Sequence, residues 1–269
     1  MSLSFSPAAQ NYIATQGSWK SLLDNGHILI YSGTKPATAD LAVTGTLLAT
    51  ITSNAGTKTN EVKGTGVLTI SGATTGSIDT CTLMGIDILG GAVTHTGDVN
   101  TMATAVALKI NRNPANNLVV ASSTGASGVI TLTALPGFGA TMNSGTLTFT
   151  ATTTTAAVTS TTFGSGTGGG VAGVAAVNGL RLDYNAVAGV FTKDTTQTWS
   201  GTAAATGTAG WFRYVGSVVD AGALDSSAAF LRMDGSIATS GADMNMSSTS
   251  VTSGALQTLS TFSFTIPAA

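Results

Sequence analysis

Residues able to carry acid–base or metal chemistry are few and widely separated in this sequence. His27 and His95 are the only histidines, Cys81 is the only cysteine, and no HxxxH or HExxH spacing links them to a partner. A zinc site gathers several His or Cys ligands, and acid–base catalysis by histidine needs a partner within hydrogen-bond reach. We therefore predict no catalytic residue, no metal site and no enzymatic activity.

Two further patterns resemble binding motifs by their letters alone. Asp220, Asp225, Asp234 and Asp243 lie too far apart for a calcium loop, which places its ligands at every second residue, so we expect them in turns and caps. The letters GGGVAG at 168–173 match a dinucleotide fingerprint, which needs a preceding strand and a following helix. A glycine-rich linker precedes them here, so we predict no cofactor.

The densest group of aromatic residues lies in the stretch TWSGTAAATGTAGWFRY, Thr198–Tyr214. Strand side chains alternate between faces, so Phe212 and Tyr214 share one face and Trp211 lies on the other. Tryptophan is enriched where interfaces concentrate their binding energy. We predict that Trp199, Trp211, Phe212 and Tyr214 serve as interface residues. The alternative, that the N-terminal helix of the same chain covers Trp211, stays open.

The composition indicates a folded protein with few surface charges. Hydrophobic residues make up 43% of the 269 residues, charged residues only 8%, and the net charge is −2. Thr, Ser, Gly, Asn and Ala must then form much of the surface. A surface with so few charges does little to prevent association and suits a protein in an assembly. The alternative is a monomer with a weakly charged surface. Scattered basic residues argue against nucleic-acid binding. The N-terminus lacks signal-peptide features, and the longest apolar run, Val171–Val177, is too short to span a membrane.

The first and last parts of the chain read as two short helices followed by β-strands. Ser6-Pro7 predicts a helix start, with the helix continuing to Thr15, and a second turn over 18–24 ends at Asn25-Gly26. Asn178-Gly179 and Asp234-Gly235 are typical of two-residue hairpin turns. The expected strands are His27–Gly33, Thr46–Thr52, Ala242–Ser248 as an exposed strand, and Leu256–Ile266 as the last one.

The middle of the chain, from about Ala55 to Asn178, is richer in Gly and Thr and has no Trp or Tyr. Asp98 predicts the cap of a helix over 99–113, which Pro114 ends. Gly164–Gly170 reads as a linker. We expect a small β-α-β module here, with strands at Val67–Ser71, Thr80–Leu89, Leu118–Ser122, Gly128–Leu135 and Gly145–Thr152.

Four blocks of the sequence resemble a family of tailed-bacteriophage virion structural proteins. They are LIYSGTKPATADLAVTGTLLATI (Leu29–Ile51), TWSGTAAATGTAGWFRY (Thr198–Tyr214), LRMDGSIATSGADMNMSS (Leu231–Ser248) and FSFTIPAA (Phe262–Ala269). Shorter relatives run almost directly from the first block to the second. The resemblance therefore covers about 1–54 and 179–269 and implies an insertion of 55–178, which resembles the modules of phage tail sheath and fibre proteins.

The expected fold is mainly β: a discontinuous β-sandwich-like domain (1–54 and 179–269) with a short N-terminal helix, interrupted by the inserted β-α-β module (55–178). The resemblance implies a structural component of a tailed-phage particle, assembled in the host cytoplasm. Our first expectation is a tail- or fibre-associated building block that acts by self-assembly. The alternatives are a capsid decoration protein and an adhesin that binds a host-surface carbohydrate. The expected partners are other copies, other virion proteins and, for an adhesin, a host glycan, with neither nucleic acid nor membrane.

Overall fold

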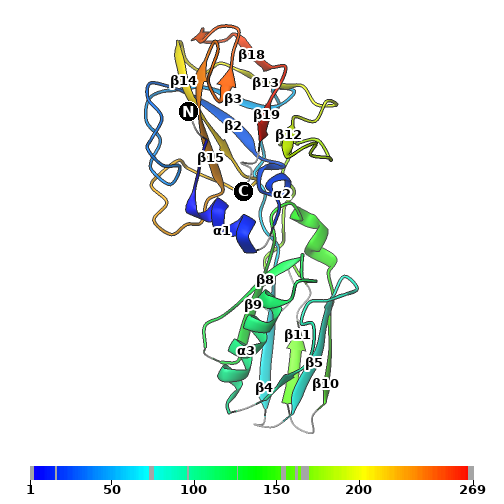
Figure 1. The fold of residues 1–269 in the computed structure, drawn as a ribbon. Helices are drawn as coiled ribbons and strands as arrows, with labels where there is room; N and C mark the ends of the chain where they lie inside the picture. Colours follow the sequence, from blue (N-terminus) through cyan, green and yellow to red (C-terminus); the bar gives the residue numbers. More distant parts are fainter. Residues whose placement is uncertain are drawn as a thin grey trace. The chain divides into compact units, whose positions relative to one another are not determined.

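The computed structural model describes residues 3–15, 17–72, 76–95, 97–125, 127–152, 156–160, 163–164 and 170–265 (Figure 1). The fold is mainly β, built from several antiparallel sheets, and this confirms the expected fold class. The chain forms two compact units. Unit 1 comprises Met1–Asn60 and Ala176–Ala269, and unit 2 comprises Glu61–Ala175. From the sequence we expect the boundaries at about 55 and 178, whereas the units divide after Asn60 and after Ala175.

Unit 1 begins with two short helices, as predicted. In α1 (Pro7–Thr15), the Ser6 hydroxyl accepts a hydrogen bond from the Ala9 amide at 3.2 Å, so Ser6 caps the helix. In α2 (Trp19–Leu23), Ser18 forms a capping box with Ser21, and each side chain bonds the backbone of the other residue. Asn25 then adopts a left-handed φ of 62°, which ends the helix and directs the chain into the first long strand.

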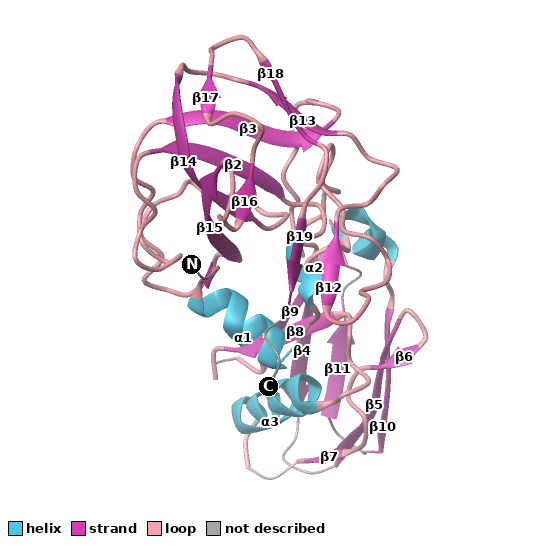
Figure 2. Cartoon of the chain, turned by 45° about the horizontal axis from the view of Figure 1, so that its top comes forward, coloured by secondary structure: helices cyan, strands magenta, loops and turns pink. Residues whose placement is uncertain are grey.

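A nine-stranded sheet forms the centre of unit 1, and its main path runs β1-β15-β14-β2-β3-β13-β18. The long strands β14 and β2 lie in the middle and pair antiparallel (Figure 2). Two short strands, β12 (Val190–Thr192) and β19 (Ser263–Thr265), form a separate ribbon. The strands of the large sheet are β1 (Ser4–Phe5), β2 (His27–Ser32), β3 (Leu47–Ser53), β13 (Trp199–Thr202), β14 (Gly207–Val215), β15 (Arg232–Ala238), β16 (Met244–Asn245), β17 (Ser250–Val251) and β18 (Leu256–Leu259).

Both predicted hairpin turns are wrong. Asp234 and Gly235 lie inside β15, where Gly235 is opposite Phe212 in β14. A Cβ at Gly235 would collide with the Phe212 ring, so this glycine provides space within a strand and forms no turn. Asn178 does turn the chain, with φ of 57°, but the residues on either side of it pair with other segments.

The two expected C-terminal strands are shorter in the structure than in the prediction. Of Ala242–Ser248, only β16 is a strand; it runs parallel to β15, and Met244 is buried. The predicted strand Leu256–Ile266 is divided, because β18 pairs with β13 whereas β19 pairs with β12. Its last residue, Ile266, lies outside the described residues.

Among its described residues, unit 2 contains two antiparallel sheets and one long helix. One sheet has the order β11-β4-β9-β8, and the other has β10-β5-β6 with β7 also pairing with β5. The helix lies between strands in the sequence, as expected, but every strand pairing described in this unit is antiparallel. The elements are β4 (Thr65–Gly72), β5 (Ser77–Leu83), β6 (Ile86–Asp87), β7 (Val93–Thr94), α3 (Val99–Arg112), β8 (Val119–Ser123), β9 (Val129–Ala134), the 3-10 helix η1 (Gly139–Ser144), β10 (Leu147–Thr152) and β11 (Ala156–Ser160).

Helix α3 confirms the predicted helix and its cap. The Asp98 carboxylate accepts hydrogen bonds from the amides of Asn100 (2.9 Å) and Thr101 (2.8 Å). The predicted strand Thr80–Leu89 is instead a hairpin, because Met84 and the following glycine both adopt positive φ. Most of the predicted linker Gly164–Gly170 lies outside the described residues. In the part of the chain that the structure describes, no helix is long and apolar enough to cross a membrane.

Candidate functional site

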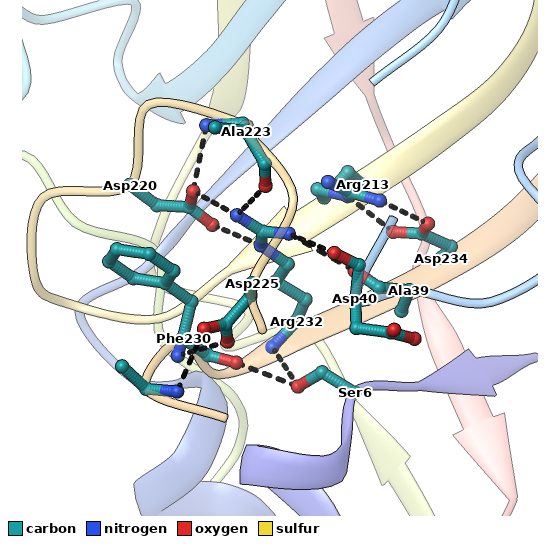
Figure 3. A network of polar contacts seen from close by, with 12 residues as sticks. Ser6, Ala39, Asp40, Arg213, Asp220, Ala223, Asp225, Phe230, Arg232 and Asp234 are labelled. Carbon is teal, nitrogen blue, oxygen red and sulfur yellow. Dashed lines mark hydrogen bonds and ion pairs between the residues drawn. The ribbon is translucent and has the colours of Figure 1, made fainter. Parts of the chain in front are cut away.

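Two buried arginines form the most elaborate polar arrangement in unit 1 (Figure 3). Arg213 comes from β14, and its guanidinium makes a bidentate ion pair with Asp234, its neighbour in β15, through Nε at 2.8 Å and Nη2 at 2.7 Å. Both side chains are completely buried. The planar guanidinium matches the two carboxylate oxygens, so each charge is neutralised inside the protein.

The second arginine, Arg232, projects from β15 and makes a comparable ion pair with Asp220. Its Nε and Nη2 each lie 2.6 Å from a carboxylate oxygen of Asp220. The remaining donors bind backbone carbonyls: Nη2 donates to Ala223 O at 2.9 Å, and Nη1 donates to Asp40 O at 3.2 Å. We call Arg213, Asp234, Arg232 and Asp220 the arginine clamp.

The arginine clamp fixes two loops against the sheet. Arg213 Nη2 donates to Leu41 O at 3.1 Å, while Arg232 binds the carbonyls of both loops. The loops also bond each other, since the Val43 amide donates to Gly222 O at 2.9 Å. Loops 39–43 and 220–225 have no regular structure, so these contacts satisfy backbone groups that a helix or strand would satisfy internally.

The electrostatics of the clamp indicate a structural role. Burial raises the pKa of Asp234, against the opposing effect of the Arg213 guanidinium. Asp225, at the end of the second loop, has a lowered pKa: burial alone would raise it, but the amides of Phe230 and Ala229 and the Ser227 hydroxyl bind the charged form more strongly. These carboxylates are engaged with protein donors, which suits positioning of the loops.

The clamp shows where the sequence-based interpretation of the aspartates fails. Asp225 and Asp243 do bind local backbone amides, as expected for turn and cap residues. Asp220 accepts from the Gly222 amide and also pairs with Arg232, whereas Asp234 is an ion-pair partner inside a strand. The sequence could have indicated these ion pairs, because each arginine is the one charged residue in an apolar strand sequence, WFRYV or FLRM. A buried cation requires a buried anion as its partner.

The four aromatic residues predicted as an interface are core residues of unit 1. Trp199, Trp211, Phe212 and Tyr214 each have no exposed surface. Three of them, on one side of the sheet, contact the ring of Phe262. The interface prediction for these side chains is therefore corrected, because none of them presents surface to a partner in this conformation.

Trp211 lies on the opposite side of β14 from Phe212 and Tyr214, as the alternation predicts, yet the chain itself covers it. Its ring stacks on Tyr31 from β2, with centroids 4.6 Å apart and planes inclined by 14°. The Arg213 guanidinium lies 5.6 Å from the same ring, within the range of a cation–π contact. The expected alternative, cover by the N-terminal helix, is replaced by stacking within the sheet and on the clamp.

The histidines and the cysteine lie in separate environments. Burial, followed by the charge of Lys58, lowers the pKa of His27 to about 4, so its imidazole is neutral at pH 7. His95 is buried in unit 2, and neither ring nitrogen has a hydrogen-bond partner among the described residues. Burial raises the pKa of the Cys81 thiol to about 12, with Asp87 contributing, and a thiol in that state is unreactive.

Within the described ranges, no three His, Cys, Asp or Glu side chains converge in a way that could hold a metal ion. The comparisons with known proteins add no candidate site. No family model matches the chain, and neither the curated proteins nor the solved structures contain a match. The functional argument therefore rests on the residues and contacts of this chain.

Proposed function

We propose that this protein is a structural component of a tailed-phage particle, a tail- or fibre-associated building block that acts by self-assembly. The four sequence blocks that resemble virion proteins motivate the proposal. The observation that carries it is the distribution of charge between the interior and the surface. A protein that works by association needs a surface on which copies can approach each other without strong repulsion.

Charged residues are scarce in this chain, and six of the twenty-two have side chains with little or no exposed surface. The sequence has ten Lys and Arg and twelve Asp and Glu in 269 residues. The clamp buries four of these charges, and others bind backbone amides in the interior. The charged side chains with little or no exposed surface are Glu61, Arg213, Asp220, Asp225, Arg232 and Asp234.

Two long segments have no charged residue at all. One runs from Asn113 to Leu180, through most of unit 2, and the other from Met244 to the C-terminus. Both contain exposed Ser, Thr and Gly residues. Surfaces of this kind carry little electrostatic repulsion between copies, which supports an assembled state over a dispersed one.

The location of the chain in a purified particle tests the proposal. We expect quantitative mass spectrometry of purified particles to detect the protein at low copy number, and immunogold labelling to place it at the tail. A high copy number with label over the head would favour a capsid decoration protein. Absence from purified particles would overturn the structural role altogether.

One observation favours an adhesin as a second candidate. Tyr184 is 83% exposed and follows Asp183 in a loop that ends in a tight turn closed by Val187 and Val190. An exposed aromatic ring offers an apolar face on which a sugar ring can stack, and a carboxylate accepts hydrogen bonds from hydroxyls. Glycan-array binding that is lost in Tyr184→Ala, with particle incorporation unchanged, would favour this function.

A further inference from the structure

In the part of the chain that the structure describes, strand β18 is an open edge of the large sheet in unit 1. It pairs with β13 along one side, and the sheet path ends there. A hollow of about 340 Å³ lies along it, lined mainly by polar residues of the segments 245–250 and 256–261. Neither Lys nor Pro occurs in Leu256–Leu259, although these are the residues that commonly protect an edge from pairing.

The register of β18 identifies which backbone groups face outward. The Ala203 amide donates to Ala255 O at 2.9 Å, so this opposed pair is hydrogen-bonded. Hydrogen-bonded and non-bonded pairs alternate along an antiparallel ladder. Gln257 and Leu259 therefore direct their backbone groups toward β13, whereas Leu256 and Thr258 direct theirs away from it.

An edge strand in unit 2 shows how this protein protects an edge. Strand β8 ends its sheet, and Asn111 from α3 binds the backbone of Ala121 with both ends of its side-chain amide, each at 2.8 Å. Asn116 binds the Val119 carbonyl at 2.9 Å. Among the described residues, no side chain makes a comparable bond to the outward backbone groups of β18.

We propose that β18 pairs antiparallel with β18 of a second copy of this chain, which continues the sheet across a two-fold axis. This inference rests on the proposed function of self-assembly and assigns the surface that carries it. Each copy contributes the same outward N–H and C=O groups, so an antiparallel arrangement satisfies both strands equally.

The chemistry around β18 favours a second copy over a charged partner. The chain has no charged residue after Asp243, so β18 offers nothing to complement a charged strand and nothing that would repel its own copy. Leu256 is 62% exposed beside the open edge, and pairing would bury part of that apolar surface.

Analytical ultracentrifugation over a concentration series tests this surface. We expect the wild type to dimerise and Thr258→Lys to raise the dissociation constant on the order of ten-fold or more, because the two-fold axis brings the new charges together. Thr104→Lys is the matched control, since it adds the same charge to an exposed threonine of α3 in unit 2. Unchanged melting of both variants would confirm that their folds are intact.

Hydrogen exchange on the wild type gives a second readout that needs no variant. At dimer-forming concentrations the Thr258 amide should become protected, whereas the Gln257 amide is protected at every concentration. A wild type that stays monomeric at about 1 mM, equal dimerisation of Thr258→Lys, or protection of Thr258 only by another virion protein would each overturn the proposal. If the β18 dimer is not found but the chain is present in purified particles, the β18 proposal is wrong and the proposed function is unaffected. If the dimer forms but the chain is absent from particles, the proposed function is wrong and the β18 proposal is unaffected.

Discussion

The two units cover the faces of their sheets with different kinds of contact. In unit 1, irregular loops cover part of the central sheet, and the arginine clamp and stacked aromatic rings hold them there. In unit 2, α3 packs against β4, β8 and β9 over a mainly aliphatic core. A helix satisfies its own backbone, whereas loops need side-chain donors, so the polar interior of unit 1 follows from the kind of cover it has.

The two units also differ in the hydrogen-bond donors that surround their buried carboxylates. Glu61 in unit 2 accepts hydrogen bonds from the backbone amides of Gly137 and Gly139 at 2.9–3.0 Å. Asp234 in unit 1 faces a guanidinium instead. Disruption of a buried ion pair leaves a charge without compensation, so unit 1 should be the more sensitive of the two to loss of a single charge.

Removal of unit 2 is the largest change that tests this comparison. Thr59 and Val177 exchange backbone hydrogen bonds of 3.1 Å, so a short glycine linker can join Asn60 to Ala176 in place of 61–175. We expect a protein that unfolds cooperatively, with a denaturant m-value lower by roughly two-fifths because m follows the surface exposed. Urea titration followed by tryptophan fluorescence measures this. Loss of the cooperative transition would show that unit 1 depends on unit 2.

Asp234→Asn should destabilise unit 1 by about 3–5 kcal/mol, because it leaves the buried Arg213 guanidinium without an anion. The double variant Arg213→Met with Asp234→Leu should recover most of that loss, since it removes both charges together. Arg181→Gln is the control, because it breaks the exposed ion pair to Asp194 and should cost less than about 1 kcal/mol. Chemical denaturation of each variant gives the three values.

Acid titration should weaken unit 1 through His27. The unfolded imidazole takes up a proton near pH 6.5, whereas the folded one does so only near 4. The stability due to the neutral form is therefore complete above about pH 6.5 and falls with decreasing pH, by about 3 kcal/mol in total by pH 4. His27→Gln should flatten the dependence of the melting temperature on pH across this window.

The carboxylates of Asp194 and Asp225 titrate below that window. Asp194 and Asp225 have pKa values lowered from 3.8, so their contributions disappear only at still lower pH. A wild-type melting temperature that stays constant between pH 6.5 and 4 would contradict the assigned environment of His27.

The smallest effect concerns the protected edge of unit 2. Asn111→Ala removes two hydrogen bonds to Ala121 and should cost about 1–3 kcal/mol, because it leaves backbone groups of β8 without partners. It should also increase concentration-dependent association, since β8 then resembles β18. Light scattering of this variant beside Thr104→Ala, which keeps the edge covered, compares the two edges directly.

The sequence alone determines the features set by local chemistry. The helix of 99–112 follows from its Asp98 cap and its apolar spacing, and the N-terminal helix follows from Ser6-Pro7, because caps and periodicity act over a few residues. The alternation that separates Trp211 from Phe212 likewise depends only on strand geometry. The mainly β class and the change in Gly and Thr content near residues 55 and 178 follow from the composition.

Only the tertiary structure decides what covers each face. Asp234-Gly235 has the local signature of a turn, but a distant arginine and a distant phenylalanine hold both residues in a strand. Trp211 is buried by Tyr31, which lies far from it in the sequence. Ion pairing and ring stacking between remote segments overrode local propensity at these positions, because burying a charge or a large ring requires a partner that local sequence does not specify.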